Sequence, residues 1–243
     1  MLFIWLLLHD TNHLLHIHTH LPFTKNKYLN IFLDISMGVV TGMTASNWRI
    51  QHKYGHHCSN VGDYCLGRPW EMEKFSLKGA IWYSLRSIIP IFFKPLRESF
   101  VKGVKENRTL PLNYRWAFTE QFLFILFFIY LTSWKPLLTI EYMLPWYLLV
   151  YFVTRYTDYL NHFGCTHNEY EIANNCLNKF DNLVCNNFGY HTAHHLYPNA
   201  HWSKLPDIHK QIENRIPHQM IKLYSWSGFL IPYHFFLALK GKM

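Results

Sequence analysis

The sequence has no closely paired cysteines. Its five cysteines, Cys58, Cys65, Cys165, Cys176 and Cys185, form no CxxC motif. This spacing argues against a rubredoxin-like iron site and against a structural zinc ribbon. An odd number of cysteines also argues against a disulfide scaffold and favours a reducing compartment. We therefore interpret the cysteines as ordinary thiols.

Other absences narrow the class of protein further. The opening MLFIWLLL has neither a basic leader nor a small-residue cleavage site, so no signal peptide is recognisable. Lysine and arginine are scattered along the chain without a known nucleic-acid-binding motif, so we do not expect a nucleic acid as partner. We also find no motif for haem, flavin or an iron–sulfur cluster, so any electrons that the protein uses must come from outside.

The composition indicates a membrane protein with a charged aqueous face. Half of the 243 residues are hydrophobic and 18% are aromatic, yet the formal net charge is +8. Such a chain suits a bilayer and is attracted to anionic lipid headgroups or to an acidic partner. The chain also contains 17 histidines, far more than is usual. We find no linker or repeat, so we expect residues 1–243 to form a single domain.

Two segments are apolar enough to cross a bilayer, which requires about 20 residues. Residues 116–134 contain FLFILFFIYL, and residues 137–153 follow a short turn at Lys135 and Pro136. We predict that the two segments form a transmembrane hairpin. Its open ends are flanked by the positive charges of Lys102, Lys105, Arg108, Arg115 and Arg155. The positive-inside rule therefore predicts that these ends face the cytoplasm, in a bacterial inner membrane or the endoplasmic reticulum.

Three other apolar stretches are not predicted to make a full crossing. Residues 1–8 are too short and are expected to be the end of a helix whose beginning is absent, so an N-terminal span is apparently missing. Residues 28–46 contain Asn30 and Asp34, and we predict a re-entrant or interfacial segment there. Residues 79–93 are interrupted by an arginine and a proline, which favours a helix lying at the headgroups.

Histidines recur in four groups, in HDTNH, HKYGHH, DYLNHFGC and HTAHH. Positions three or four apart share one face of a helix, so the imidazoles of a group can point at one place. Neutral imidazole is a strong ligand for transition metals. The predicted metal ligands are His9, His13, His52, His56, His57, His162, His191, His194 and His195. Because one tetrahedral ion takes four ligands, nine imidazoles predict two metal ions with positions left open.

Other histidines compete for these roles. His16 and His20 have the same i, i+4 spacing as His9 and His13, and one pair cannot be preferred over the other from spacing alone. His167 likewise competes with the histidine of DYLNHFGC. The remaining histidines are interpreted as surface or hydrogen-bonding residues.

Two aspartates are candidates for a supporting catalytic role. A ligating histidine usually needs an acceptor that fixes its tautomer and the orientation of its ring. Asp10 follows His9 directly, and Asp158 lies one helical turn before His162. We therefore predict that Asp10 and Asp158 accept hydrogen bonds from metal-bound imidazoles.

A shared metal core constrains the topology. The first two histidine groups must lie on one side of the membrane, so residues 28–46 between them cannot cross completely. The hairpin within 116–153 crosses twice and returns the chain to the same face, where the last two groups follow. The predicted fold class is therefore all-α, a helical integral membrane protein with a cytoplasmic, histidine-rich di-metal cap.

The four motifs, in this order around a membrane hairpin, resemble those of the integral-membrane fatty acid desaturase superfamily. HKYGHH has the wider HxxGHH spacing of the membrane alkane monooxygenases in that superfamily, and DYLNHFGC is similar to their NYxEHYG element. In contrast, GYHTAHHLYP followed by HWSKLP is closer to general desaturases. The resemblance covers nearly the whole chain, and the mixed second motif leaves the substrate open.

The resemblance implies a non-haem di-iron centre, with two Fe ions and O2 as co-substrate, that acts on unactivated C–H bonds of a fatty acyl or other lipid chain. The activity most expected is that of a fatty acid desaturase, with a ferredoxin, rubredoxin or cytochrome b5-like electron donor. A membrane alkane or fatty acid hydroxylase, or a terminal-alkene-forming decarboxylase, is the near alternative.

An alternative from another class is a histidine-rich membrane metal-binding or transport protein. A transporter places ionisable ligands inside its spanning helices. Residues 122–131 and 137–153 contain no histidine, which disfavours that alternative.

Overall fold

The computed structural model describes residues 2–57, 75–107, 112–166, 168–225 and 231–241. Within these ranges, the side chains of residues 2–10 and 231–232 are not described. The described part of the chain is mainly helical, as predicted, and its two strands are only two residues long. The fold class expected from the sequence, a helical membrane protein with gathered histidines, is confirmed.

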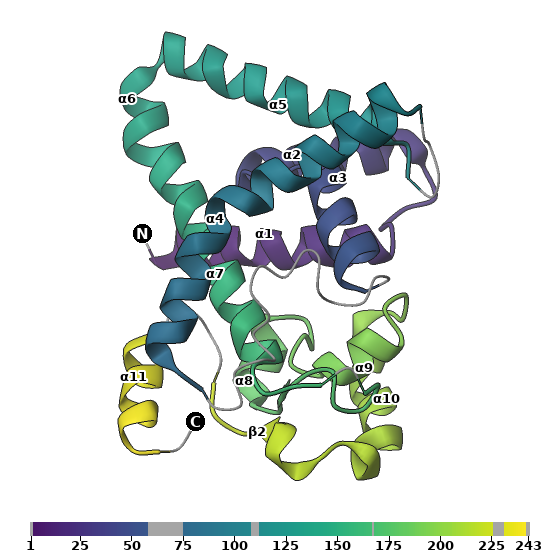
Figure 1. Ribbon diagram of the computed structural model, residues 1–243, viewed down its shortest axis with the longest axis vertical. Coiled ribbons are helices and arrows are strands. Elements are labelled where there is room, and N and C mark those ends of the chain that lie inside the picture. The colour runs from purple at the N-terminus through teal and green to yellow at the C-terminus, as the bar shows by residue number, and fades with distance from the viewer. Residues whose placement is uncertain (1, 58–74, 108–111, 167, 226–230, 242–243) are drawn as a thin grey trace. The chain divides into compact units, whose positions relative to one another are not determined.

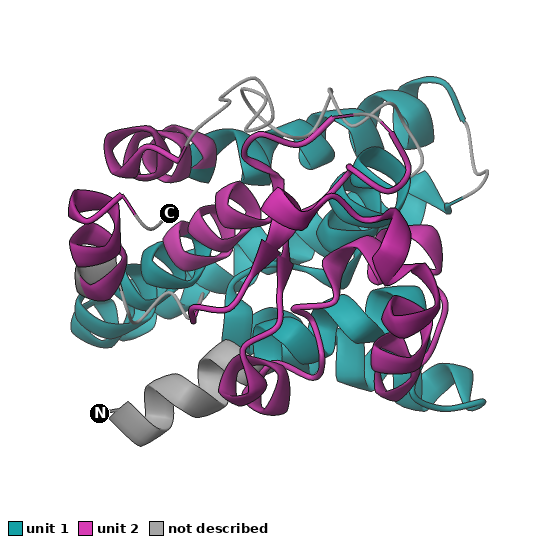
Figure 2. Ribbon diagram, turned by 90° about the horizontal axis from the view of Figure 1, so that it is seen from below, with its two compact units in different colours: residues 1–58, 88–151 teal, residues 59–87, 152–243 magenta. Residues whose placement is uncertain are grey.

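The chain divides into two compact units (Figure 2). Unit 1 consists of Met1–Cys58 and Ile88–Tyr151, and unit 2 consists of Ser59–Ser87 and Phe152–Met243. The division falls inside two long helices, Leu77–Ser99 and Leu144–His162, so each of these helices contributes residues to both units.

Unit 1 is built from helices alone among its described residues (Figure 1). They are α1 (Leu2–His20), α2 (Lys27–Thr41), α3 (Ala45–Trp48), the π-helix η1 (Arg49–His56), the second half of α4 (Leu77–Ser99), the π-helix η3 (Phe100–Lys105), α5 (Tyr114–Trp134), α6 (Pro136–Leu138), the π-helix η4 (Thr139–Met143) and the first part of α7 (Leu144–His162). Their buried core includes Leu15 of α1, Met37 of α2 and Trp48 of α3.

Sequence signals at both ends of α2 explain its bounds. The Asn26 side chain accepts hydrogen bonds from two backbone N–H groups of the first turn, at 2.9 and 3.1 Å, which is the usual N-cap arrangement. The helix ends at Gly42, whose φ of 76° is left-handed. Thr44 then caps α3 by accepting from the Asn47 N–H. The helical segments before and after this turn are bent by 88°, as in a broken span or a re-entrant loop.

The turn after α2 is held by aromatic residues of α7. A Cβ built on Gly42 would lie 2.4 Å from the ring of Tyr147, so only glycine fits there. The Tyr147 hydroxyl donates to the Val39 carbonyl at 2.6 Å, and the Tyr151 hydroxyl donates to the Gly42 carbonyl. These bonds satisfy carbonyl groups that the end of α2 leaves without helical partners.

Two described helical segments are long and apolar enough to cross a membrane, namely Tyr114–Trp134 and Pro136–His162. Helix α2 and the bent segment that follows it, Ala45–His56, form a third candidate if they are counted together as one span. The segments predicted from the sequence, 116–134 and 137–153, lie within Tyr114–Trp134 and Pro136–His162. On α5, large apolar side chains such as Phe122, Leu126 and Ile129 are exposed, which suits contact with lipid.

Unit 2 carries the short strands and most of the short helices. Its described elements are the first part of α4, the last part of α7, β1 (Asn175–Cys176), α8 (Lys179–Val184), α9 (His191–Leu196), the 3-10 helix η5 (Trp202–Lys204), α10 (Leu205–Ile212), the 3-10 helices η6 (Glu213–Arg215) and η7 (His218–Met220), β2 (Ile221–Lys222) and α11 (Ile231–Leu239). Strand β1 pairs in parallel with β2, with Asn175 opposite Ile221.

Two apolar clusters hold unit 2 together. In the first, Tyr156, Tyr159 and Leu160 of α7 pack with Tyr83 of α4. In the second, Ala193 of α9 is buried together with residues of α10, including Leu205 and Ile212. Packing against α10 is needed because a six-residue helix such as α9 is not stable alone. These two clusters fix the ends of α7 and α9, which carry histidines.

Replacing Gly42 by alanine should lower the free energy of unfolding by about 1–3 kcal/mol, because a left-handed backbone disfavours a Cβ and the new methyl group overlaps Tyr147. Thermal unfolding in one detergent measures the effect. Gly38→Ala is the matched control, since its Cβ meets the nearest atom at an ordinary 3.5 Å and alanine favours a helix interior. An unfolding temperature of Gly42→Ala equal to that of Gly38→Ala would contradict this account.

Candidate metal centre

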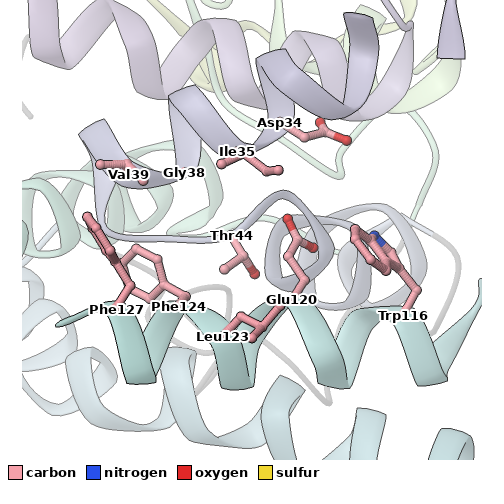
Figure 3. A pocket seen from close by; sticks show the side chains of 10 residues that line it. All are labelled: Asp34, Ile35, Gly38, Val39, Thr44, Trp116, Glu120, Leu123, Phe124 and Phe127. Atoms are coloured by element: carbon pink, nitrogen blue, oxygen red, sulfur yellow. The ribbon is translucent and has the colours of Figure 1, made fainter. Parts of the chain in front are cut away.

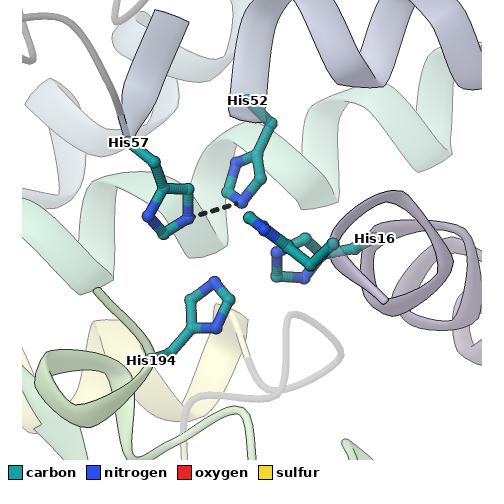
Figure 4. Close-up of side chains that lie close together, drawn as sticks. His16, His52, His57 and His194 are labelled. Atoms are coloured by element: carbon teal, nitrogen blue, oxygen red, sulfur yellow. Dashed lines mark hydrogen bonds between the residues drawn. The ribbon is translucent and has the colours of Figure 1, made fainter. Parts of the chain in front are cut away.

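The first histidine cluster lies in unit 1. It consists of His16 and His20 on α1, His52 on η1 and His57 directly after η1, and each offers a ring nitrogen within 4.8 Å of the others. Figure 4 shows the rings of His16, His52 and His57 pointing toward one another. His16 and His20 are buried, and His57 is half-buried. Four converging imidazoles are enough to hold one transition-metal ion.

Helical geometry positions the two histidines of α1. His16 and His20 are four residues apart, so their rings lie on one face of the helix, with 5.1 Å between the ring centroids. The centroid of the His16 ring lies 4.3 Å from that of the His52 ring. It lies 5.6 Å from the ring centroid of the buried Trp48, on which His16 stacks. The indole therefore covers part of the cluster with apolar surface.

His52 and His57 meet because η1 is a π-helix. In a π-helix the hydrogen bonds join residues five apart, and the His57 N–H donates to the His52 carbonyl. The Nε2 atoms of the two rings lie 3.0 Å apart. The motif HKYGHH contains one residue more than HxxHH, and the wider π-helical turn accommodates that residue. His56 is buried as well, and its ring stacks on His52 at 5.1 Å.

The structure distinguishes among the histidines of α1. His9 lies in the helix, but its side chain is outside the described residues. His13 is buried on the same helix, yet it is not part of the first histidine cluster, whereas His16 and His20 are. The two pairs share the same spacing, so the sequence alone gave no signal that separates them.

An ion pair joins the elements that support the first cluster. Arg49, the first residue of η1, donates from Nη2 to both carboxylate oxygens of Asp34 on α2, at 2.9 and 2.8 Å. Asp34 Oδ1 also lies 3.4 Å from Nε2 of His18 on α1. One carboxylate therefore ties α1, α2 and η1 together. Sequence reasoning missed this role, because Arg49 follows Asp34 by 15 residues and no helical spacing relates them.

The second histidine cluster lies in unit 2. It consists of His162 at the end of α7 and of His191 and His195 on α9, whose ring nitrogens also lie within 4.8 Å of one another. The Nε2 atoms of His162 and His191 are 3.3 Å apart. His194 is on the same short helix, with its ring centroid 5.6 Å from that of His191. The two sequence motifs predicted to supply ligands after the hairpin thus meet within this unit.

A backbone carbonyl orients the ring of His162. Its Nδ1 lies 2.9 Å from the carbonyl oxygen of Ile172. Because a carbonyl oxygen can only accept, Nδ1 carries a proton and Nε2 presents a lone pair on the side of His191. This is the usual arrangement for a histidine that binds a metal.

Asn175 of β1 fixes the start of α9. Its side-chain amide donates to the Thr192 hydroxyl at 2.8 Å and accepts from the Thr192 N–H at 3.0 Å. The Thr192 hydroxyl donates in turn to the Ala173 carbonyl at 2.9 Å. All of these groups are buried, so α9 has little freedom to turn His191 away from His162.

Burial keeps His194 of α9 in the form that binds metals. Desolvation, with a smaller contribution from neighbouring His162, lowers the pKa of His194 to about 3. The imidazole is therefore neutral at physiological pH. Only the neutral ring has a lone pair to offer to a metal ion.

The structure describes one of the two aspartates that were predicted to accept hydrogen bonds from the ligands. Asp10 and the competing His167 lie outside the described side chains. Asp158 accepts a hydrogen bond from the Tyr83 hydroxyl and forms an ion pair with Arg155 at 3.4 Å. The acceptor found at Nδ1 of His162 is the Ile172 carbonyl, so the role predicted for Asp158 stays a prediction.

The donor atoms of both clusters fit a metal ion. Two imidazole nitrogens that each lie about 2.0–2.1 Å from one ion are roughly 3 Å apart, and the Nε2 pairs here are 3.0 and 3.3 Å apart. Both clusters consist of imidazoles alone within their own unit, a donor set that suits iron, copper or zinc rather than magnesium or calcium.

Known proteins resemble this chain over most of its length. The model of the fatty acid desaturase family matches residues 1–227. The curated rice protein "Sphingolipid delta(4)-desaturase DES1-like" (Oryza sativa subsp. japonica) is 23% identical over 239 residues, which cover 95% of this chain and 66% of the rice protein. The chain thus spans just under two thirds of that relative's length. No solved structure gives a significant match.

Replacing Asn175 by alanine should loosen α9 and weaken metal binding by about tenfold, a typical effect of losing a residue that orients a ligand. The change also leaves the buried Thr192 N–H without its acceptor, which costs about 1–3 kcal/mol of stability. Metal titration and thermal unfolding measure the two effects. Asn168→Ala, at an exposed site of the same unit, is the control, and equal metal affinity in both variants would refute the role of Asn175.

Proposed function

Because the chain belongs to the fatty acid desaturase family, we propose that it is an O2-dependent membrane oxidoreductase that desaturates a fatty acyl or related lipid chain. The observation that supports this activity best is the pair of buried clusters of imidazoles in a chain with two candidate membrane spans. The rice relative is named for a sphingolipid desaturase, which supports a lipid as the substrate class.

We propose that the two histidine clusters hold two iron ions. The proposed ligands are His16, His20, His52 and His57 in the first cluster and His162, His191 and His195 in the second. His56 and His194, which lie beside these rings, are proposed as further ligands, and His9 and His13 stay predictions from the sequence. When bound, iron supplies the oxidation of an unactivated C–H bond with O2, which side chains cannot perform.

The protein's own groups prepare these sites in three ways. Burial lowers the pKa of His52, His162 and His194 and so favours their neutral forms. The Ile172 carbonyl holds the proton of His162 on Nδ1 and leaves Nε2 for the metal. The Asp34–Arg49 ion pair and the Asn175–Thr192 bonds fix the elements that carry the ligands. Each group therefore sets an orientation or a protonation state before any metal arrives.

We also propose an external electron donor of the ferredoxin, rubredoxin or cytochrome b5 type, because desaturation with O2 consumes electrons that this chain has no recognisable cofactor to supply. Lys105 and Arg115 are exposed near the start of α5, the end away from the hairpin turn. From the positive-inside rule we propose that this end faces the cytoplasm, where an acidic donor surface would be attracted to it. Arg155 is buried and paired with Asp158, so it does not belong to that surface.

Metal analysis of the purified protein tests the cofactor. Wild-type protein should retain about two iron ions per chain, as expected when each cluster of three or four imidazoles fills one site. His52→Ala and His162→Ala should each lower the iron content by about half or more. His201→Ala removes an exposed histidine whose ring bonds to Ser203, outside both histidine clusters, and should leave the content unchanged. Zinc without iron in the wild type would reject the proposal.

Product analysis tests the reaction. Membranes that contain the protein, a reductant system and a deuterium-labelled fatty acyl lipid should yield a product that has lost a pair of hydrogens, and His57→Ala should abolish it. Mass spectrometry separates this outcome from a gain of oxygen, which indicates a hydroxylase, and from a loss of carbon dioxide, which indicates a decarboxylase. Either of these would replace the desaturase assignment.

A further inference from the structure

Two buried regions lie outside the histidine clusters. In unit 1, a pocket of about 320 Å³ lies between α2 and α5 (Figure 3). Its walls are mainly apolar, and its carboxylates already bind other groups, since Asp34 binds Arg49 and Glu120 accepts from the Ser46 N–H. The pocket therefore indicates no particular ligand. In unit 2, by contrast, a fully buried histidine outside the four motifs, His234 of α11, belongs to a series of bonded polar groups.

His234 uses both of its ring nitrogens. Its Nε2 lies 2.7 Å from the carbonyl oxygen of Ser225, and because a carbonyl oxygen can only accept, Nε2 carries the proton. In the neutral ring Nδ1 is then an acceptor, and it lies 3.1 Å from the hydroxyl of Tyr156 on α7. The rings of His234 and Tyr156 also stack, with 5.7 Å between their centroids. Two directional bonds therefore fix this side chain between α7 and the segment that precedes α11.

Packing alone would not require a histidine at this position. Leu237 is also buried on α11, whereas Phe235 and Phe236 are exposed. An apolar side chain at 234 could pack on Tyr156 without the cost of desolvating a polar ring. A histidine with both nitrogens bonded instead fixes the orientation of its partners. Since the family model matches residues 1–227 and α11 begins at Ile231, membership of the family does not imply a role for His234.

Ser225 connects His234 to α8. Its hydroxyl donates to Oδ1 of Asp181 at 2.5 Å, and Oδ2 of the same carboxylate accepts from the Cys176 thiol at 3.4 Å. Asp181 and Cys176 are buried, where hydrogen bonds are stronger than in water. The residue that holds His234 thus also holds the start of α8, and α8 in turn contacts β1.

The same part of α8 and β1 holds the backbone that enters α9. The side-chain amide of Asn182 donates to the Cys176 carbonyl at 2.8 Å and accepts from the Gly189 N–H at 3.1 Å. The Cys176 N–H donates to the Gly189 carbonyl at 2.9 Å. A Cβ on Gly189 would lie 2.2 Å from the Cys176 carbonyl oxygen, so the close approach requires glycine. Because Gly189 precedes His191 by two residues, these bonds set where α9 begins.

We propose that His234 is a positioning residue of the second histidine cluster, and that it acts from α11 through Ser225 and Asp181 on the start of α9. Its importance for a metal site rests on the function proposed above for that cluster. The coupling of α11 to α9 is nevertheless a property of the metal-free protein, so it can be measured without metal. Loss of His234 should loosen α9 and leave the first cluster, in unit 1, unchanged.

Hydrogen exchange of the full, metal-free chain in lipid nanodiscs tests the coupling. His234→Phe retains a ring that can stack on Tyr156 but removes both bonds. The backbone amides of α9 should then exchange about tenfold faster, as expected for the loss of one or two buried hydrogen bonds, whereas those of α2 should not change. Phe235→Ala, at an exposed site of the same helix, is the matched control and should leave α9 unchanged.

A second variant separates the proposed connection from local packing around α11. Ser225→Ala keeps the carbonyl that accepts from His234 and removes the hydroxyl that donates to Asp181. It should speed the exchange of α9 as His234→Phe does, and the double variant should show little further change, because both substitutions break the same series of bonds. His234→Gln, whose amide offers both a donor and an acceptor, should have a smaller effect than His234→Phe.

Titration with cobalt(II), followed by its absorption spectrum, tests the effect on metal binding. In a His52→Ala background, which leaves the second cluster intact, His234→Phe should weaken binding by about tenfold, a typical effect of losing a residue that orients a ligand. In a His162→Ala background, which leaves the first cluster intact, it should change nothing.

Three results would overturn the proposal: exchange of α9 in His234→Phe that is no faster than in Phe235→Ala, unchanged exchange in Ser225→Ala, or an equal rise of exchange in α2, which indicates general loosening. If the wild type binds no cobalt(II), the proposed metal centre fails, while faster exchange of α9 alone still supports the coupling. The two proposals can therefore fail separately.

Discussion

The fold depends on satisfying several buried imidazole nitrogens at once. The Nε2 atoms of His52 and His57 lie 3.0 Å apart, and those of His162 and His191 lie 3.3 Å apart. Between neutral rings, each pair can be joined by one N–H···N hydrogen bond whose direction depends on the tautomers. Such a bond satisfies two nitrogens at a time, and protonating further rings would place charge in a buried environment. A metal cation can instead accept a lone pair from every ring of a cluster at once.

The two units position their histidine rings by different structural means. Unit 1 uses the α-helical spacing of α1 and the π-helical spacing of η1, and it links the two through the Asp34–Arg49 ion pair. Unit 2 uses a six-residue helix that is held by Asn175 and by packing on α10. Neither solution depends on intrinsic helix stability, since π-helices and short helices are weak by themselves. Tertiary bonds therefore decide where the nitrogens point.

The sequence predicted which segments carry the histidines, but it did not predict how each ring is positioned. Long apolar runs predicted the two membrane segments, and the motif spacings predicted histidine-bearing helices. Spacing could not separate His13 from His16 and His20, because all of them lie on one regular helix. The motif HKYGHH placed His52 and His57 in one predicted group of ligands, but the π-helical turn that joins them was not predicted, because a π-helix has no reliable sequence signal. From the sequence, Asp34 could be identified only as a residue unsuited to a membrane span. Its ion pair with Arg49 could not be predicted, because the bend after Gly42 brings the two residues together.

The most direct test of the account is the thermal stability of the purified protein with and without bound metal. A ligand that binds only the folded state stabilises it in proportion to its binding free energy. We predict that removing metal with a chelator lowers the unfolding temperature of the wild type, that adding iron(II) without oxygen restores it, and that a His52→Ala, His162→Ala double variant responds to neither treatment. An unfolding temperature of the wild type that is the same with and without metal would contradict the claim that these imidazoles are arranged around a cation.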